Sequence, residues 1–110
     1  MKSAKKQISQ EEFEELLAVE RNVIDEANED AVAALKKRVD ASKRVAAAKF
    51  LAGVPNFSAA REEKIRLKAR ELASKHSLKE EDGEALVMLM LSIARREQEE
   101  LRKELEKKAK

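Results

Sequence analysis

Apolar side chains recur every three or four residues along most of the chain, which is the period of an amphipathic α-helix. No glycine or proline interrupts the pattern between Ser9 and Gly53. Ser9 and Glu12 have the spacing of an N-terminal capping box, and Gly53-Val54-Pro55 is a typical helix stop. The pattern therefore predicts a first helix of about 43 residues, roughly 65 Å long at about 1.5 Å per residue.

Two shorter helices are predicted to follow. Ser58 comes after a short loop and can cap a second helix, which runs to about Lys75. Ser77 and Glu80 repeat the capping-box spacing, so the third helix is predicted to begin there and to continue to near the C-terminus. Together these patterns predict an all-α fold, a three-helix protomer with a very long first helix.

The composition agrees with long helices. Charged residues make up 42% of the sequence, while glycine occurs twice and proline once. This balance is typical of helical proteins rather than of sheets. No linker or repeat divides the chain, so we expect residues 9 to 110 to form one domain, preceded by a flexible N-terminal segment of residues 1 to 8.

Several functional classes are disfavoured by what the sequence lacks. It has no cysteine, and His76 alone cannot hold zinc, so we expect no metal and no cofactor. The net charge is +2 with both signs interspersed, and Tyr and Trp are absent, which argues against a nucleic-acid partner. No apolar run is long enough for a bilayer and no signal-peptide core is present, so a cytoplasmic protein without a membrane partner is expected.

The length of the first helix predicts a partner. A compact domain of this size has a radius of gyration of about 13 Å. Two shorter helices of the same chain cannot cover a helix of roughly 65 Å, whose apolar face extends from Phe13 to Leu51. A second copy of the chain is the simplest partner that could cover this apolar face, and we therefore expect an intertwined homodimer.

Polar residues interrupt the apolar stripes of all three predicted helices. They are Arg21, Asn28, Arg38, Ser42 and Lys49 in the first, Glu62 in the second and Gln98 in the third. A buried charge costs several kcal/mol unless it is paired. The pattern therefore predicts a polar cavity for an anion. In the alternative interpretation, the cations reach solvent or pair with glutamates across a helical seam.

The spacing of the cations suggests a shared site. Arg38 and Lys49 are about 16 Å apart along a helix axis, so two long side chains can share one small ligand. Arg21 is about 42 Å from Lys49 and cannot reach that ligand in its own chain. In an antiparallel dimer the partner subunit's Arg21 could reach it, which predicts two equivalent sites.

The ordered set of residues resembles the all-helical chorismate mutases over about Phe13 to Gln98. The resemblance rests on Arg21, Ile24, Asn28, Val32, Leu35, Arg38, Lys49, Gly53-Val54-Pro55, Arg61-Glu62, Leu72, His76 and Gln98. It implies a homodimeric isomerase that converts chorismate to prephenate in the aromatic amino acid branch of the shikimate pathway. This Claisen rearrangement is unimolecular and requires no nucleophile, proton transfer, metal or redox cofactor.

The resemblance also implies roles for the charged residues. Arg38 would bind one substrate carboxylate, and the partner subunit's Arg21 would bind the other. Lys49 would contact the ether oxygen and a carboxylate, and Gln98 would donate to the ether oxygen. Glu62 would accept from the ring hydroxyl, with Arg61 nearby, and a carboxylate there favours a hydroxyl over an amino group.

Three positions depart from the family pattern. Ser58 stands where an acidic residue is common, and its backbone would meet the hydroxyl. Ala94 stands where many members carry a serine or another polar group that touches a carboxylate. Asn28 replaces the usual aspartate of the dimer core.

Other functions on the same scaffold stay open at this point. The chain could be an isochorismate pyruvate lyase or a 4-amino-4-deoxychorismate mutase. It could also be a non-catalytic helical interaction protein, in which Lys49 and Gln98 would have no role in binding a small ligand.

Overall fold

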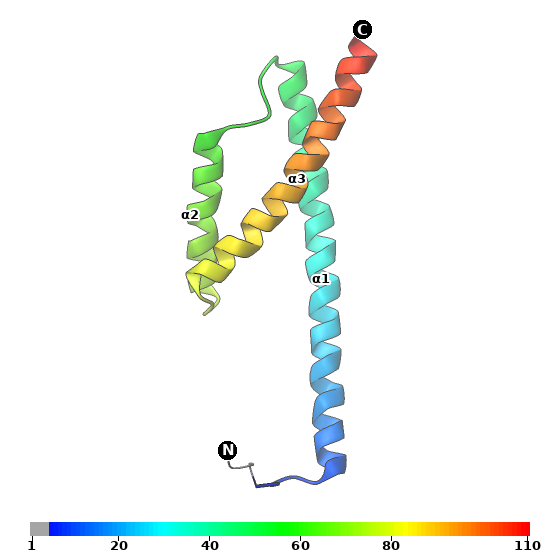
Figure 1. The fold of residues 1–110 in the computed structure, drawn as a ribbon, viewed down its shortest axis with the longest axis vertical. Helices are drawn as coiled ribbons and strands as arrows, with labels where there is room; N and C mark the ends of the chain where they lie inside the picture. The colour runs from blue at the N-terminus through cyan, green and yellow to red at the C-terminus, as the bar shows by residue number, and fades with distance from the viewer. Residues whose placement is uncertain (1–4) are drawn as a thin grey trace. The chain divides into compact units, whose positions relative to one another are not determined.

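The computed structural model describes residues 5–110, which form three helices and, within that range, no strand (Figure 1). The helices are α1 (Gln10–Leu51), α2 (Ala59–Lys75) and α3 (Glu80–Ala109). The predicted all-α fold with a long first helix is therefore confirmed. Of the predicted N-terminal segment, residues 5–8 precede α1 without helical structure, and residues 1–4 lie outside the described range.

Ser9 begins α1 as predicted. Its Oγ accepts a hydrogen bond from the backbone N–H of Glu12 at 3.1 Å. The same hydroxyl donates to Oε1 of Glu12 at 3.2 Å, so the carboxylate bonds to the capping hydroxyl. One of the N–H groups that the first helical turn leaves unpaired is thereby satisfied.

Gly53 ends α1, also as predicted. Its φ is 70°, a left-handed conformation that costs glycine little. The N–H of Val54 bonds to the carbonyl of Lys49 at 2.8 Å, and the N–H of Gly53 bonds to that of Phe50 at 3.1 Å. These two bonds form a Schellman motif, which closes the helix and turns the chain into the loop.

The beginning of α3 differs from the prediction. Ser58 does cap α2, accepting from the N–H of Arg61 at 3.3 Å. Ser77, however, does not cap α3, because it is the left-handed residue that ends α2, with a φ of 60°. The N–H of Leu78 bonds to the carbonyl of Ala73 at 2.8 Å, which completes a second Schellman motif. The N-cap of α3 is Lys79, which forms no side-chain capping bond.

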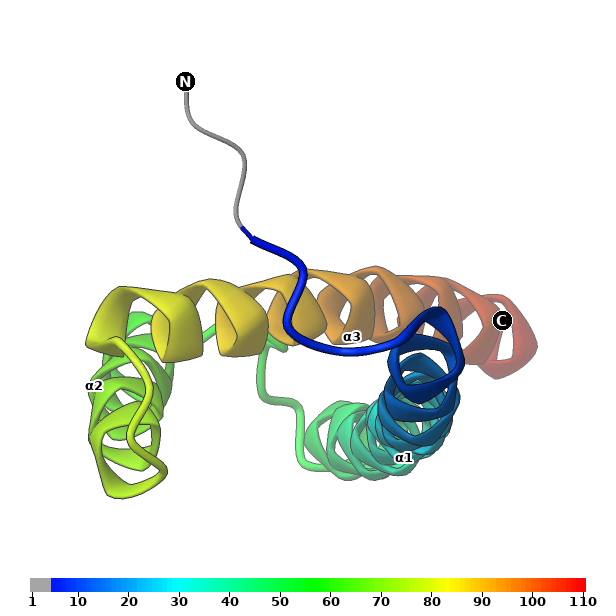
Figure 2. The same ribbon diagram turned by 90° about the horizontal axis from the view of Figure 1, so that it is seen from below.

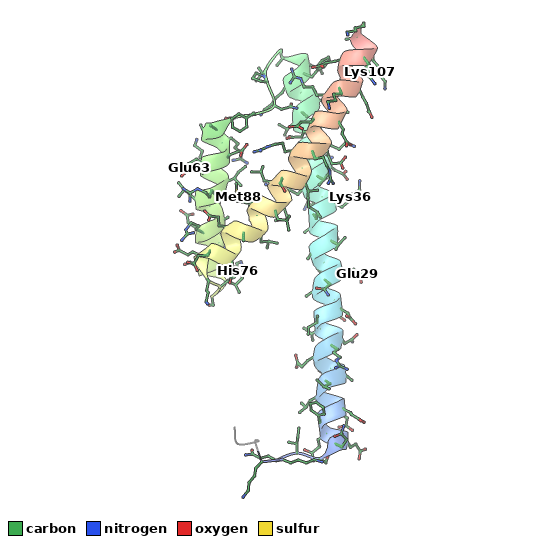
Figure 3. The ribbon with its side chains drawn as sticks, viewed as in Figure 1. Glu29, Lys36, Glu63, His76, Met88 and Lys107 are labelled. Atoms are coloured by element: carbon green, nitrogen blue, oxygen red, sulfur yellow. The ribbon has the colours of Figure 1, made fainter. Side chains whose placement is uncertain are left out.

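His76 lies at the C-cap of α2, where Figure 3 labels it at the turn into α3. Its backbone N–H bonds to the carbonyls of Leu72 and Ala73 at 3.1 Å each. The side chain is exposed, in keeping with the structural role that its place near a helix end suggests.

The chain divides into two compact units, the first ending at Ala34 and the second comprising Leu35–Lys110. In the second unit, α3 extends from α2 to the end of α1 (Figure 2). The buried residues among those described are all alanines: Ala46, Ala69, Ala73 and Ala94, each at most 3% exposed. Small side chains let helix backbones approach closely, and α2 and α3 make such a contact.

Gly83 makes the closest of these approaches possible. A Cβ atom at this position would lie 2.5 Å from Cβ of Ala73 and 2.7 Å from the carbonyl oxygen of Ala69. Both distances are far below van der Waals contact. Glycine at position 83 therefore fixes how tightly α3 crosses α2.

Ion pairs surround the same crossing. Arg66 of α2 bonds to Glu84 of α3 at 2.8 Å, and Arg70 contacts Glu80 at 3.2 Å. These side chains are partly exposed, so each pair contributes at most about 1 kcal/mol. The pairs add specificity to a crossing whose distance is set by the small residues.

The described part of the first unit, residues 5–34, buries no side chain. Its large apolar residues are exposed by 39% to 67%: Ile8, Phe13, Leu16, Val19, Val23, Ile24 and Val32. An apolar helix face of this extent is stable in water only when another element covers it. No helix within residues 5–110 combines the length and the apolar character needed to cross a membrane.

Ser77→Gly is expected to raise the free energy of unfolding by about 0.5–1 kcal/mol, because the left-handed conformation strains a residue that has a Cβ. Urea unfolding at fixed protein concentration measures the change. Gly53→Ala, at the equivalent position of α1, is the matched control and should lower stability by a similar amount. A destabilising Ser77→Gly would contradict the assignment of Ser77 to a strained C-terminal cap.

Gly83→Ala is expected to lower the free energy of unfolding by about 1–3 kcal/mol, because the new methyl group has no space against Ala73. Inside an unconstrained helix the same exchange would stabilise by about 0.5–1 kcal/mol, so the sign of the effect is diagnostic. Ala85→Gly, at an exposed site two residues away, reports the propensity effect alone. A stabilising Gly83→Ala would show that α3 does not cross α2 this closely.

Candidate active site

The second unit contains a cavity of about 510 Å³ between the end of α1, the following loop, α2 and α3. Figure 3 shows the side chains that these elements carry. Six of the eight residues predicted for the site line this cavity: Arg38, Lys49, Ser58, Arg61, Glu62 and Gln98. The structure therefore places these six residues at one cavity, and their functional roles stay a prediction.

The two other predicted residues do not line the cavity. Arg21 is an exposed residue of the first unit. Ala94 is only 1% exposed and belongs to the buried alanines of the second unit. A side-chain contact between Ala94 and a ligand therefore has no support in this arrangement.

The lining is rich in cations. Arg38, Lys49, Arg61 and Arg95 face two carboxylates, Glu62 and Glu99. Within residues 5–110, no carboxylate lies at ion-pairing distance from Arg38, Lys49 or Arg61. Three positive charges at one cavity without an anionic partner favour a ligand that brings its own negative charge.

The surroundings of Arg38 in this cavity lower the pKa of its guanidinium group. Its side chain is half-buried, and burial lowers the pKa of its guanidinium below the usual value. The neighbouring charge of Arg61 lowers the pKa further. The guanidinium still stays charged at any physiological pH, so an anion bound between the two arginines would relieve their repulsion.

Lys49 lies in the last turn of α1 and joins the helix to the loop. Its Nζ donates to the backbone carbonyl of Asn56 at 2.9 Å. An ammonium group has three N–H donors, so two stay available to the cavity. The bond to Asn56 fixes the direction in which the ammonium group points.

Arg102 of α3 holds the same loop from the other side. One of its guanidinium nitrogens donates to the carbonyl of Val54 at 2.7 Å and contacts Oδ1 of Asn56 at 3.4 Å. The guanidinium also lies 5.6 Å from the ring centroid of Phe50, a cation–π contact. The loop that carries the hydrogen-bond partner of Lys49 is thus fixed to both α1 and α3.

Gln98 is anchored in a comparable way. Its Nε2 donates to the backbone carbonyl of Ser42 in α1 at 2.7 Å. The amide has a second N–H, which can serve a ligand in the cavity without loss of the first bond. Two fixed donors, from Lys49 and Gln98, therefore come from different helices to one cavity.

Glu62 forms an ion pair with a residue that the sequence interpretation missed. Its Oε2 bonds to a guanidinium nitrogen of Arg95, and this guanidinium lies 5.5 Å from the ring centroid of Phe57. Arg95 stands three residues before Gln98 and hence on the same face of α3. That spacing was the available signal.

Asn56 and Glu99 also line the cavity without having been predicted. Asn56 lies in a loop, where no periodicity indicates direction. Glu99 directly follows Gln98, and its exposed side chain reaches the rim although it is off the apolar stripe. Within residues 5–110 no three His, Asp or Glu side chains gather in a way that could hold a metal ion.

The fold and the site together define a small helical protein whose cavity presents guanidinium, ammonium and amide donors. The family model of chorismate mutase type II matches residues 20–99, and the chain belongs to this all-helical family. The matched range includes every residue that lines the cavity. Neither the curated proteins nor the solved structures gave a match to the chain.

Proposed function

We propose that this protein is a chorismate mutase that converts chorismate to prephenate. The family supports an isomerase activity on chorismate. The observation that carries the specific proposal is the set of three unpaired cations, Arg38, Lys49 and Arg61, around one cavity that also holds an amide donor. Chorismate is a dianion with an ether oxygen and a ring hydroxyl, which matches this set of groups.

The reaction makes limited chemical demands. Within one molecule the ether C–O bond breaks as a C–C bond forms, and the product is an isomer of the substrate. No proton is transferred and no electron enters or leaves. The protein must hold the substrate in its compact reactive conformation and stabilise the negative charge that develops on the ether oxygen.

The cavity offers a group for each demand. Arg38, assisted by Arg61, binds one carboxylate, since the two guanidinium groups repel each other without an anion. Lys49 and Gln98 direct their remaining N–H groups to the ether oxygen. Their other hydrogen bonds, to backbone carbonyls, hold the two side chains in place. Pre-positioned donors need no reorganisation as the charge appears, which is the main source of catalysis here. Glu62 accepts from the ring hydroxyl.

We assign the second carboxylate to the partner subunit's Arg21 in a homodimer, because Arg38 and Arg61 are assigned to the first carboxylate. The support is the exposed apolar face of residues 5–34, where Phe13 is 45% and Ile24 is 55% exposed and the two lie about three helical turns apart on one side. A second copy would cover this face. Pairing the first units of two chains would then bring the partner subunit's Arg21 to the cavity.

Ser58 takes a smaller part in the proposed site. Its hydroxyl caps α2 by accepting from the N–H of Arg61, so the side chain is already engaged. We assign the backbone of Ser58, at the rim of the cavity, to the region of the ring hydroxyl. A capping serine there also keeps Arg61 and Glu62 in the first turn of α2.

Lys49→Ala is expected to lower kcat for chorismate by at least about 10²-fold, because it removes a donor to the developing oxyanion. The loss of chorismate absorbance, with prephenate as the product, measures the rate. Lys37→Ala, at an exposed position of the same helix outside the cavity, is the control and should retain wild-type activity.

Three results would count against the proposal. A wild-type protein that binds neither chorismate nor an analogue would exclude the function. A Lys49→Ala protein with full activity would exclude the role of this lysine. Conversion to pyruvate instead of prephenate would identify a lyase on the same fold.

Arg21→Ala and Arg38→Ala are each expected to be poorly active alone but to regain activity when mixed. In a mixed dimer one site contains both arginines and the other contains neither. Statistical exchange therefore gives about a quarter of the wild-type activity. Activity measured during subunit exchange, with the exchange followed by mass or fluorescence, tests this.

Mixing either variant with more of itself provides the control and should change nothing. Proven exchange without recovery would overturn the shared site. A folded and fully active monomer in centrifugation would overturn the dimer itself.

A further inference from the structure

Arg95 occupies an unusual position in the cation-rich cavity. It is the one lining cation that has a carboxylate partner within residues 5–110, and that partner is Glu62. The side chain of Arg95 is 41% exposed and that of Glu62 is 22% exposed, so the pair lies at the border between the cavity and solvent. Arg95 thus lies at the rim of the cavity rather than in the buried core.

Two contacts hold the guanidinium of Arg95 where it is. Glu62 binds it from α2, and the ring of Phe57 in the preceding loop lies 5.5 Å from it. A guanidinium group that stacks on an aromatic ring and bonds to a carboxylate has little freedom to turn away. Its charge therefore stays close to whatever Glu62 binds.

The pairing changes what Glu62 can recognise. An unpaired carboxylate would attract a cation strongly, whereas a carboxylate neutralised by Arg95 offers mainly a hydrogen-bond acceptor. Oε2 is engaged with Arg95, and Oε1 is the oxygen that remains for a ligand. A neutral hydroxyl can bond to it without adding a charge.

A ring ammonium group at the same place would meet a different field. Only the carboxylate of Glu62 would separate it from the guanidinium of Arg95. Three further cations line the same cavity: Arg38, Arg61 and Lys49. Repulsion between like charges weakens binding of the ammonium substrate more than it strengthens binding of the hydroxyl substrate. Discrimination would thus come from repulsion by Arg95.

We propose that Arg95 is a specificity-determining residue, which makes the Glu62 subsite select a substrate with a ring hydroxyl over the analogue with a ring ammonium group. This assignment rests on the proposed chorismate mutase function. It goes beyond that function because it explains the choice between two substrates of the same overall shape that differ in one positive charge.

The test compares kcat/KM for chorismate and for 4-amino-4-deoxychorismate in the wild type, Arg95→Met and Arg95→Lys. Arg95→Met keeps an unbranched side chain against Phe57 but removes the charge. It is expected to shift the ratio of the two kcat/KM values toward the amino substrate by about five- to tenfold, a size that allows for the partial exposure of the pair. Arg95→Lys keeps the charge and should keep the ratio near that of the wild type.

Arg96→Met is the matched control. It removes the same charge from the next residue of α3, where the side chain is 65% exposed and outside the cavity lining. Its ratio should equal that of the wild type, which separates a local effect from a change in net charge.

The outcomes separate the two levels of the proposal. If Arg95→Met slows both substrates equally, Arg95 has only a structural role and the assignment is overturned while the function stands. A shift of equal size in Arg96→Met would also overturn it. If the wild type turns over neither substrate, the proposed function fails, and the role of Arg95 fails with it.

Discussion

Repulsion among cations that lack anionic partners is the constraint from which the rest of this site follows. Arg38 is half-buried beside Arg61, and Lys49 completes the group from the last turn of α1. Keeping these charges close together lowers the stability of the fold, and an anion bound between them offsets this loss. Any ligand that binds the folded chain in this way also shifts the folding equilibrium toward it. Binding and stability are therefore linked through the same three side chains.

The helices can hold these charges in place because their contacts are short and their side chains small. Gly83 lets α3 pass close to Ala73, and Ala46 and Ala94 are buried in the same unit. Close backbone packing leaves little room for a helix to shift. The hydrogen bond from Gln98 to Ser42 and the ion pair from Arg95 to Glu62 then join the helices across the cavity. The site is thus positioned by contacts between the helices and by the loop that Lys49 and Arg102 hold.

Much of this architecture could be predicted from the sequence. Periodicity located all three helices, and the absence of glycine and proline after Ser9 gave the length of the first. Ser9, Gly53 and Ser58 were recognised as caps because their residue types are favoured at helix ends. Three polar residues within the apolar stripes line the cavity: Arg38, Lys49 and Gln98. Their positions predicted a cavity because burial of a charged or polar side chain costs free energy unless it has a partner.

Other features could not be predicted, for identifiable reasons. Ser77 has the residue type of an N-cap, and only the backbone shows that it ends α2 in a left-handed conformation. Asn56 lies in a loop without periodicity. Arg95 shares a helix face with Gln98, but a sequence does not show which arginine meets which glutamate. The proposed role of Arg21 depends on a second chain, whose position a single sequence does not give.

In the loop between α1 and α2, the number of residues is more constrained than the residue type at position 54. Lys49 and Arg102 hold it largely through backbone carbonyls, those of Asn56 and Val54. Every residue type has such a carbonyl, so exchange of the Val54 side chain leaves these bonds available. An inserted or deleted residue would move both carbonyls out of register with their donors. The residue type at position 54 can therefore vary without loss of these two bonds, provided that the number of residues between the two helices is preserved.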